Sequence, residues 1–313
     1  RAVCDRHAAA LRAKLGKRKF AATFANGGAL SAEQAIAEAL SAEWLTARGE
    51  TLPALPIPRP APIEELRIFA LGATRVYRGE RELASSDWKY NKARELLFYL
   101  LCHSSTTKEH IGVAVWPDAS PAQLRSNFRV TLYYLRRALG SPEWVLFEEE
   151  QYTFNRELAP RYWFDVDAFE TDLEAARRFE VKDPTRAIQH LKQAAQLYQG
   201  EFMGDWAEGE WYLPRREELQ QKYIAGLMLW GQLLFADERY ADAAEVYRKA
   251  VAQDNYLEAA HRELIRCYAR QGDRGQALRQ YQSLVNLMRE ELGASPAPGT
   301  QLLYQRLQRG EEV

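Results

Sequence analysis

The sequence predicts a mainly α protein in which a winged helix-turn-helix with a small antiparallel sheet precedes an all-α, tetratricopeptide-like repeat domain. Three observations predict this architecture. A proline-rich stretch at 51–63 divides the chain. Strand-like runs and short helices, one of them strongly basic, follow over 64–156. From 160 to 313 the sequence has helical periodicity, and part of it repeats every 34 residues.

The first 50 residues are predicted to be helical, as the end of an upstream helical region. Segments 8–15 and 32–45 are alanine-rich with apolar residues at helical spacing. The stretch 51–63 then holds five prolines within ten positions, which prevent a helix and favour an extended, semi-rigid linker. The chain begins with arginine, without a signal peptide, so we expect it to be a piece of a longer protein or a processed one.

Residues 64–156 contain, in order, short strand-like runs, three helices and a final hairpin. This order of elements makes a winged helix, whose third helix enters the major groove of DNA. Glu148, Glu149 and Glu150 occupy the turn of the hairpin. The strand-like runs are 66–71, 74–77 and 81–84, the helices are 92–103, 107–116 and 120–139, and the hairpin strands are 145–147 and 152–154.

The third helix has the most informative sequence of the chain. Its large apolar residues recur every three or four positions, which gives one buried stripe. Pro121 suits the first turn, and Gly140 suits the C-terminal stop. The helix holds four arginines and no acidic residue, although the whole chain has 42 Lys/Arg and 43 Asp/Glu. The stripe is Leu124, Phe128, Leu132, Leu135 and Leu139, and the outer face is Arg125, Asn127, Arg129, Tyr133, Tyr134, Arg136 and Arg137.

Two interpretations of this helix are open from the residues alone. Arginine, asparagine and tyrosine donate to phosphates and to base edges, which fits a DNA recognition helix. Arginine is also a good helix former, so an ordinary surface helix explains the same composition. Residues 66–155 carry 12 Lys/Arg against 10 Asp/Glu, whereas 163–313 carry 19 against 25. Any nucleic-acid contact is therefore expected from the first of these two regions.

The 34-residue period lies in the C-terminal part. Ala243, Tyr247 and Ala250 recur as Ala277, Tyr281 and Leu284. This is the tetratricopeptide pattern, in which alanine lets two helices approach and tyrosine fills the groove between them, so we predict these side chains to be core. The aromatic residues around the irregular connection at 200–212 either seal the start of the repeats or form an exposed partner patch. They are Trp206, Trp211, Tyr212 and, further along, Trp230.

The chain also resembles a known family. Residues 114–140 read Ala-Val-Trp-Pro-Asp-Ala-Ser-Pro-Ala-Gln-Leu-Arg-Ser-Asn-Phe-Arg-Val-Thr-Leu-Tyr-Tyr-Leu-Arg-Arg-Ala-Leu-Gly. With the order of elements, this phrase resembles the OmpR/PhoB-type winged helix, in particular that of SARP-type bacterial transcriptional regulators. Residues 160–310 resemble the bacterial transcriptional activator domain, through Phe-Asp-Val-Asp at 164–167, Phe-Met-Gly-Asp-Trp at 202–206 and Arg-Glu-Glu-Leu-Gly at 289–293. In that family this domain directly follows the winged helix.

The resemblance implies a sequence-specific DNA-binding transcriptional regulator, an activator, located in the cytoplasm. It implies double-stranded DNA as a partner. The repeat domain would contact RNA polymerase or associate with itself in a homodimer or larger oligomer. The family pattern assigns Ser126, Asn127, Val130, Tyr133 and Tyr134 to bases, and Arg136 and Arg137 to phosphates. The basic pattern itself adds Lys108, Arg125 and Arg129 to the predicted DNA-binding set.

Two features depart from the family pattern. Tyr133 and Tyr134 stand where many relatives carry arginine, so tyrosine hydroxyls and contacts with thymine methyl groups are expected to read bases. The acidic turn at 148–150 repels phosphates, so the wing is expected to stand off the duplex. The alternative is therefore a helical-repeat interaction scaffold whose winged helix binds DNA weakly or not at all. A continuous positive face joined by Lys89, Lys92 or Lys108 would favour DNA binding.

Enzyme motifs are missing from the sequence. It has no Gly-x-x-x-x-Gly-Lys-Ser/Thr loop, Gly-x-Ser-x-Gly, His-Glu-x-x-His or Cys-x-x-Cys. Cys4, Cys102 and Cys267 are scattered without metal-ligand spacing, which fits a reducing cytosol. No apolar run approaches the roughly 18–20 residues of a membrane span. We therefore expect no catalysis, no cofactor, no metal and no membrane partner.

Overall fold

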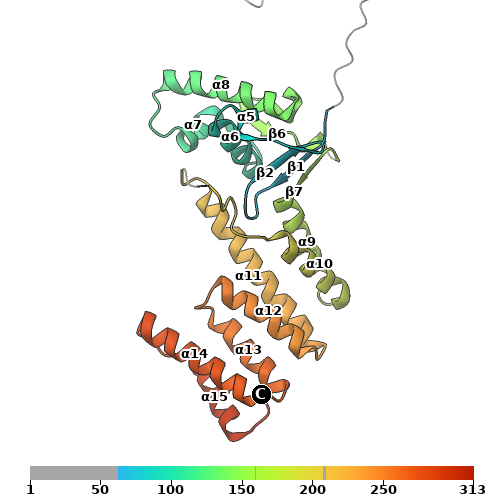
Figure 1. Ribbon diagram of the computed structural model, residues 1–313, viewed down its shortest axis with the longest axis vertical. Coiled ribbons are helices and arrows are strands. Elements are labelled where there is room, and N and C mark those ends of the chain that lie inside the picture. Colours follow the sequence, from blue (N-terminus) through green and yellow to red (C-terminus); the bar gives the residue numbers. More distant parts are fainter. Residues whose placement is uncertain (1–62, 159, 207–208) are drawn as a thin grey trace, which may run out of the picture. The chain divides into compact units, whose positions relative to one another are not determined.

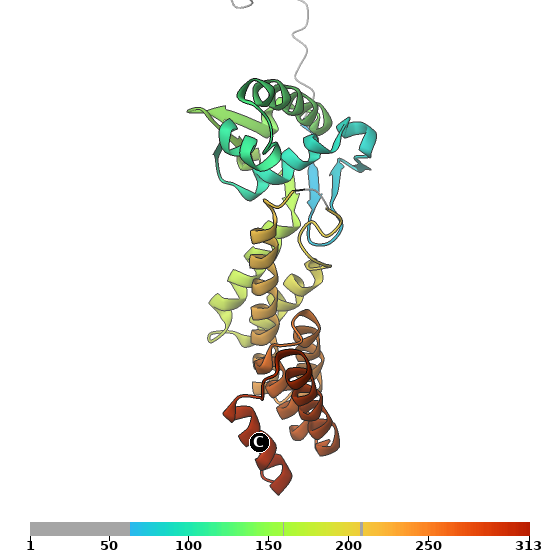
Figure 2. The same ribbon diagram turned by 90° about the vertical axis from the view of Figure 1, so that its left-hand side faces the viewer.

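The computed structural model describes residues 63–158, 160–206 and 209–313 (Figures 1 and 2). The helical tail predicted over 1–50 and the linker up to residue 62 lie outside these residues. The winged-helix part contains β1 (Leu66–Phe69), β2 (Arg75–Arg78), β3 (Arg81–Glu82), α5 (Ser85–Trp88), α6 (Asn91–Cys102), β4 (Thr106–Thr107), α7 (Lys108–Val115), α8 (Pro121–Leu139), β5 (Val145–Glu148), β6 (Gln151–Phe154) and β7 (Tyr162–Phe164). The helical part contains α9 (Asp165–Phe179), α10 (Pro184–Leu197), α11 (Leu213–Ala236), α12 (Tyr240–Gln253), α13 (Glu258–Arg270), α14 (Arg274–Leu292) and α15 (Pro298–Arg309).

The winged-helix part holds two small sheets rather than one. The first has the strand order β3-β2-β1-β7, and the second, which forms the wing, has the order β4-β6-β5. All pairs are antiparallel except β1 with β7, in which Leu66 lies opposite Tyr162. The predicted strands and hairpin are confirmed, but α5, β4 and β7 were not predicted. Because β7 runs directly into α9, it ties the first sheet to the helical part.

The recognition-type helix α8 forms where the sequence predicts it. Ser120 caps its first turn, since Ser120 Oγ accepts from Gln123 N at 3.4 Å while Ser120 N donates to Gln123 Oε1 at 2.9 Å. Gly140 ends the helix with a φ of 79°, a left-handed conformation that glycine adopts without strain. Phe128, Leu135 and Leu139 of the predicted stripe are buried, and Leu124 and Leu132 are half-buried. The stripe packs on α6 and thereby fixes which face of α8 points outward.

The repeat prediction is confirmed in the helical part. The alanine, tyrosine and leucine side chains that recur at 34 residues are all buried on α12 and α14. A Cβ on Gly231 of α11 would lie 2.5 Å from the Tyr247 ring, so glycine at this position lets α11 and α12 approach closely. The consecutive helices pack antiparallel to one another along the chain, as Figure 1 shows.

A dense polar joint connects the two parts. Asp165, the first residue of α9, is 2% exposed, and its Oδ2 accepts from Ala70 N and Leu71 N at 2.8 Å each. Met203 N donates to Ala70 O at 2.8 Å, and Leu71 forms a β-bridge with Phe202. Main-chain atoms after β1 are therefore bonded both to α9 and to the irregular connection before α11.

The tryptophans of the irregular connection pack on α6 rather than on the repeats or in an exposed patch. Trp211 Nε1 donates to Glu95 Oε1 at 3.0 Å, and its ring meets Tyr99 edge-on at 5.1 Å. Arg94 lies over the Trp206 ring at 5.3 Å. Because these contacts cover the second side of α6, this helix is buried nearly all round, including its Glu95 side chain.

Candidate nucleic-acid interface

The outer crest of α8 is formed by Ser126, Val130, Tyr133 and Arg137, which follow one another at helical spacing and are all exposed. Val130 is 40% exposed and Tyr133 is 60% exposed. Tyr133 meets the Tyr134 ring edge-on at 5.2 Å, but most of its surface and much of that of Val130 stay uncovered. In Figures 1 and 2, α8 lies at the end of the described region opposite α14 and α15.

Three arginines flank or continue this crest. Arg125, Arg129 and Arg137 are exposed, and in the part of the chain that the structure describes no acidic side chain forms an ion pair with them. Asn127 is exposed beside them. A crest with free guanidinium groups, one amide and two uncovered apolar or aromatic side chains provides both phosphate donors and base-edge readers.

Two of the predicted DNA contacts lie on the sides of α8 instead. Arg136 is half-buried, and its Nη2 donates to Val145 O of β5 at 2.8 Å. Tyr134 is half-buried and packs edge-on against Tyr90 with 5.5 Å between ring centroids. These contacts hold the wing and the segment before α6 against α8. Direct contact of Arg136 and Tyr134 with DNA stays a prediction, and the structure gives both side chains a positioning role.

The lysines that were expected to extend the positive face differ in their surroundings. Lys108 Nζ lies 3.3 Å from Glu109 Oε1, and Lys92 Nζ lies 2.8 Å from the buried Glu95 Oε2. Lys89 is exposed and makes no ion pair within the described residues. Of these three lysines, Lys89 is therefore the one with an uncompensated charge near α8.

The wing presents carboxylates on a strained turn. Glu149 and Glu150 have φ values of 50° and 61°, a backbone conformation that residues other than glycine, asparagine and aspartate rarely adopt. Tyr152 links the wing to α8, because it packs against Phe147 at 4.5 Å and against Phe128 at 4.6 Å. The wing is thus firmly attached while its tip carries only negative charge.

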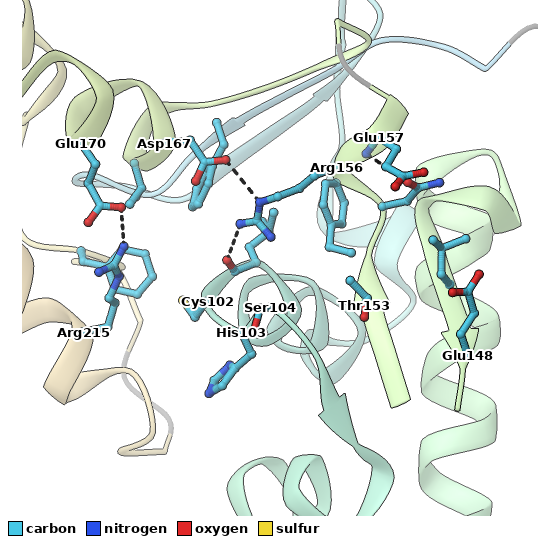
Figure 3. A pocket seen from close by; sticks show the side chains of 17 residues that line it. Cys102, His103, Ser104, Glu148, Thr153, Arg156, Glu157, Asp167, Glu170 and Arg215 are labelled. Atoms are coloured by element: carbon cyan, nitrogen blue, oxygen red, sulfur yellow. Dashed lines mark hydrogen bonds and ion pairs between the residues drawn. The ribbon is translucent and has the colours of Figure 1, made fainter. Parts of the chain in front are cut away.

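A cavity of about 510 Å³ lies where the wing meets the helical part (Figure 3). Two of its arginines are paired with carboxylates of α9. Arg156 lies 3.6 Å from Asp167 and donates to Leu101 O at 2.8 Å, while Arg215 lies 2.7 Å from Glu170. Burial raises the pKa of the Cys102 thiol to about 12, so this thiol is protonated at neutral pH and is a poor nucleophile. The Arg156–Asp167 pair therefore links the winged-helix part to α9, and the Cys102 thiol is not a candidate nucleophile.

Across 63–313, apart from the three residues not described, no group of three or more His, Cys, Asp or Glu side chains has an arrangement that could hold a metal ion. Among the helices that the structure describes, none combines the length and apolarity that crossing a membrane requires.

The chain is similar to one protein family and to several known regulatory proteins. Residues 164–308 match the bacterial transcriptional activator domain family. Regulatory protein AfsR of Streptomyces griseus is 28% identical over 265 residues, which are 81% of this chain and 26% of AfsR. Transcriptional regulatory protein MoaR1 of Mycobacterium bovis (strain BCG) is 26% identical over 210 residues, which are 63% of this chain and 64% of MoaR1.

A solved structure shares the fold. Mycobacterium tuberculosis EmbR, in complex with a low affinity phosphopeptide, superposes with a TM-score of 0.69 at 17% identity, and the match covers 80% of this chain and 66% of EmbR. The chain thus spans between 26% and 66% of the length of these three relatives. The family and the named relatives are transcriptional regulators rather than enzymes. The chain thus has a winged helix followed by a bacterial transcriptional activator domain, an arrangement similar to that of SARP-type bacterial transcriptional regulators.

Proposed function

We propose that this chain binds double-stranded DNA sequence-specifically and activates transcription by placing α8 in the major groove. The observation that carries the proposal is the outer face of α8. Its exposed arginines have no acidic partner in the described residues, and Asn127, Val130 and Tyr133 are uncovered beside them. A helix of this kind on a winged-helix frame has the dimensions and the donors that the major groove accepts.

The exposed residues divide into two roles. Arg125, Arg129 and Arg137 bind phosphates and fix the position of α8 on the duplex. Asn127 makes paired hydrogen bonds to adenine, while Ser126, Val130 and Tyr133 contact base edges and thymine methyl groups. Tyr134 and Arg136 support this surface from its sides, through Tyr90 and Val145 respectively. Lys108, at the start of α7, is assigned to a phosphate.

The helical part provides the protein contacts of the proposed regulator. Residues 163–313 carry a net negative charge, so they are poorly suited to lie along DNA. We assign them to contact with RNA polymerase or to self-association, in the cytoplasm. The joint at Asp165 and Trp211 would hold these surfaces in a fixed relation to α8.

The specificity test uses Asn127. Duplexes selected from a random pool by the wild-type chain give the preferred sequence. Asn127→Ala should relax the preference at one or two base pairs by about 1–3 kcal/mol, because a paired hydrogen bond to adenine is lost. Affinity for random duplexes should hardly change. Equal losses on selected and random duplexes would show that Asn127 only positions the protein and reads no base.

The acidic wing favours a second candidate, an interaction scaffold that binds DNA poorly. Replacing Glu148, Glu149 and Glu150 together by glutamine separates the two functions. If α8 binds DNA and the wing stands off, affinity should stay nearly constant at about 0.15 M salt, where screening acts over roughly 8 Å. It should rise severalfold at about 0.01 M salt, where repulsion reaches roughly 30 Å. Weaker DNA binding after neutralisation would contradict the proposal and favour the scaffold.

A further inference from the structure

A polar cavity of about 450 Å³ lies beside the C-terminal end of α8. It adjoins the outer crest at Arg137, and elements far apart in sequence build it. The segment from β2 to the end of α5 forms one wall, and the last turns of α8 form the other. The lining residues are Arg78, Arg81, Ser86, Asp87, Lys89, Tyr134, Arg137 and Ala138.

The charges around this cavity do not balance. Arg81 donates to both carboxylate oxygens of Asp87, at 2.8 and 3.1 Å, and these two charges compensate each other. Lys89 and Arg137 have no acidic partner within the described residues. Arg78 lies 3.5 Å from Glu64, so two of the four lining cations, Lys89 and Arg137, remain uncompensated, and this excess positive charge favours an anion.

The cavity lies at the C-terminal end of α8, where the negative end of the helix dipole disfavours an anion. Arg78 offsets this effect. Its Nη1 donates to Ala138 O at 3.1 Å, which occupies one of the free carbonyls of the last turn. A Cβ on Gly140 would lie 3.1 Å from Arg78 Cδ and Nη1, so glycine leaves room for this guanidinium. Its Nε is buried without a hydrogen-bond acceptor and lies 3.5 Å from Glu64 Oε2.

Lys89 is held at the cavity by an unfavourable backbone conformation. It follows α5 with a φ of 68°, in the left-handed region that lysine rarely adopts. Residues kept in such conformations cluster at functional sites, where the position of the side chain matters. Here the strained residue carries the exposed ammonium group of the cavity.

We propose that this cavity binds a phosphoryl group, namely a backbone phosphate of the duplex whose major groove α8 enters. This inference rests on the proposed DNA binding and extends the contact beyond α8 itself. The crest from Ser126 to Arg137 runs about 16 Å along the helix axis at 1.5 Å per residue, and it ends at the cavity. Arg137 belongs to both surfaces, so a phosphate in the cavity lies on the path of the same DNA strand.

The variant Lys89→Gly tests the inference. It removes the ammonium group and also relieves the positive φ, so the fold should be at least as stable as in the wild type. Affinity should fall about 10-fold on selected and random duplexes alike, as expected for the loss of one charge-assisted contact. The slope of log affinity against log salt should flatten by about 0.9. Lys89→Arg, which keeps the charge, should restore both values.

Two matched variants control for charge and for backbone. Lys182→Gln removes an exposed lysine between α9 and α10 and should leave the salt slope unchanged. Glu238→Gly relieves a φ of 58° in the helical part without removing a cation, and DNA affinity should stay constant. If Lys89→Gly behaves like these controls while the wild type binds DNA, the phosphate contact is wrong and the proposed function stands.

Titration with inorganic phosphate in the absence of DNA examines the cavity separately, through the amide NMR shifts of 78–89 and 137. Shifts there that vanish in Lys89→Gly, together with a flattened DNA slope, support the inference. Phosphate shifts with an unchanged slope overturn the DNA part, because the cavity would then serve a free phosphate compound. If the wild type binds no DNA, the proposed function fails, and the absence of phosphate shifts would also reject the cavity as an anion site.

Discussion

Replacing Arg125 and Arg129 together by alanine should weaken binding to every duplex by about 10- to 100-fold, since each removes a charge-assisted hydrogen bond to phosphate. The slope of log affinity against log salt should fall by about 1.8, or about 0.9 for each phosphate contact. Both side chains are exposed, so the thermal unfolding midpoint should hardly move. Binding assays across a range of salt concentrations measure the affinity and the slope, and a thermal unfolding curve measures the midpoint.

The matched control for this variant removes two exposed arginines elsewhere. Arg177 and Arg178 lie in the last turn of α9, and their double alanine variant changes the net charge equally. Its salt slope should equal that of the wild type. An unchanged slope in the Arg125 and Arg129 variant would mean that these side chains do not face phosphate, and the proposed orientation of α8 would be wrong.

Asp165→Ala should lower the free energy of unfolding by about 2–4 kcal/mol, because it leaves the buried Ala70 and Leu71 amides without an acceptor. Asp165→Asn keeps an acceptor oxygen and should cost less. Urea unfolding of the two variants beside the wild type measures the difference. Equal, small losses in both would show that water or another group satisfies these amides and that the joint does not depend on Asp165.

Asp165 should also make the free energy of unfolding depend on pH. Burial raises the pKa of Asp165 to about 6, from an ordinary value of 3.8, although several backbone amides favour its charged form. The folded state therefore holds a proton that the unfolded chain has already released between about pH 4 and pH 6. The contribution of this group to stability is full below pH 4 and falls as the pH rises through 6. Asp165→Asn should lack this fall, which unfolding curves at pH 4 and pH 7 compare directly.

The sequence predicts α8 and the repeats well because the patterns that define these helices lie within short segments of the chain. Apolar spacing, a proline in the first turn and a terminal glycine predict α8 from residues 120–140 alone. The 34-residue recurrence of Ala243 and Tyr247 likewise needs only positions along the chain. In both cases the periodicity of the helix decides which side chains are buried, and no knowledge of a distant partner is needed.

The joint and the sides of α8 could not be predicted, because their contacts join residues far apart in sequence. Asp165 at a helix N-terminus is already explained by the dipole, and nothing local indicates that its acceptors serve amides of Ala70 and Leu71. Tyr134 and Arg136 lie at the flanks of the helix, where spacing alone does not distinguish solvent from a neighbouring element. In the structure, Tyr90 packs against Tyr134, and Val145 O accepts from Arg136.

The most direct test of the central claim is the salt dependence of wild-type binding, measured in parallel on a selected duplex and on a random one. If α8 lies in the major groove, both duplexes should show slopes of about −3 to −4, from Arg125, Arg129, Arg137 and Lys89 at about 0.9 each. The selected duplex should bind more tightly at every salt concentration, because base contacts add to the phosphate contacts. Equal affinity for the two duplexes, or binding that does not change with salt, would contradict this account.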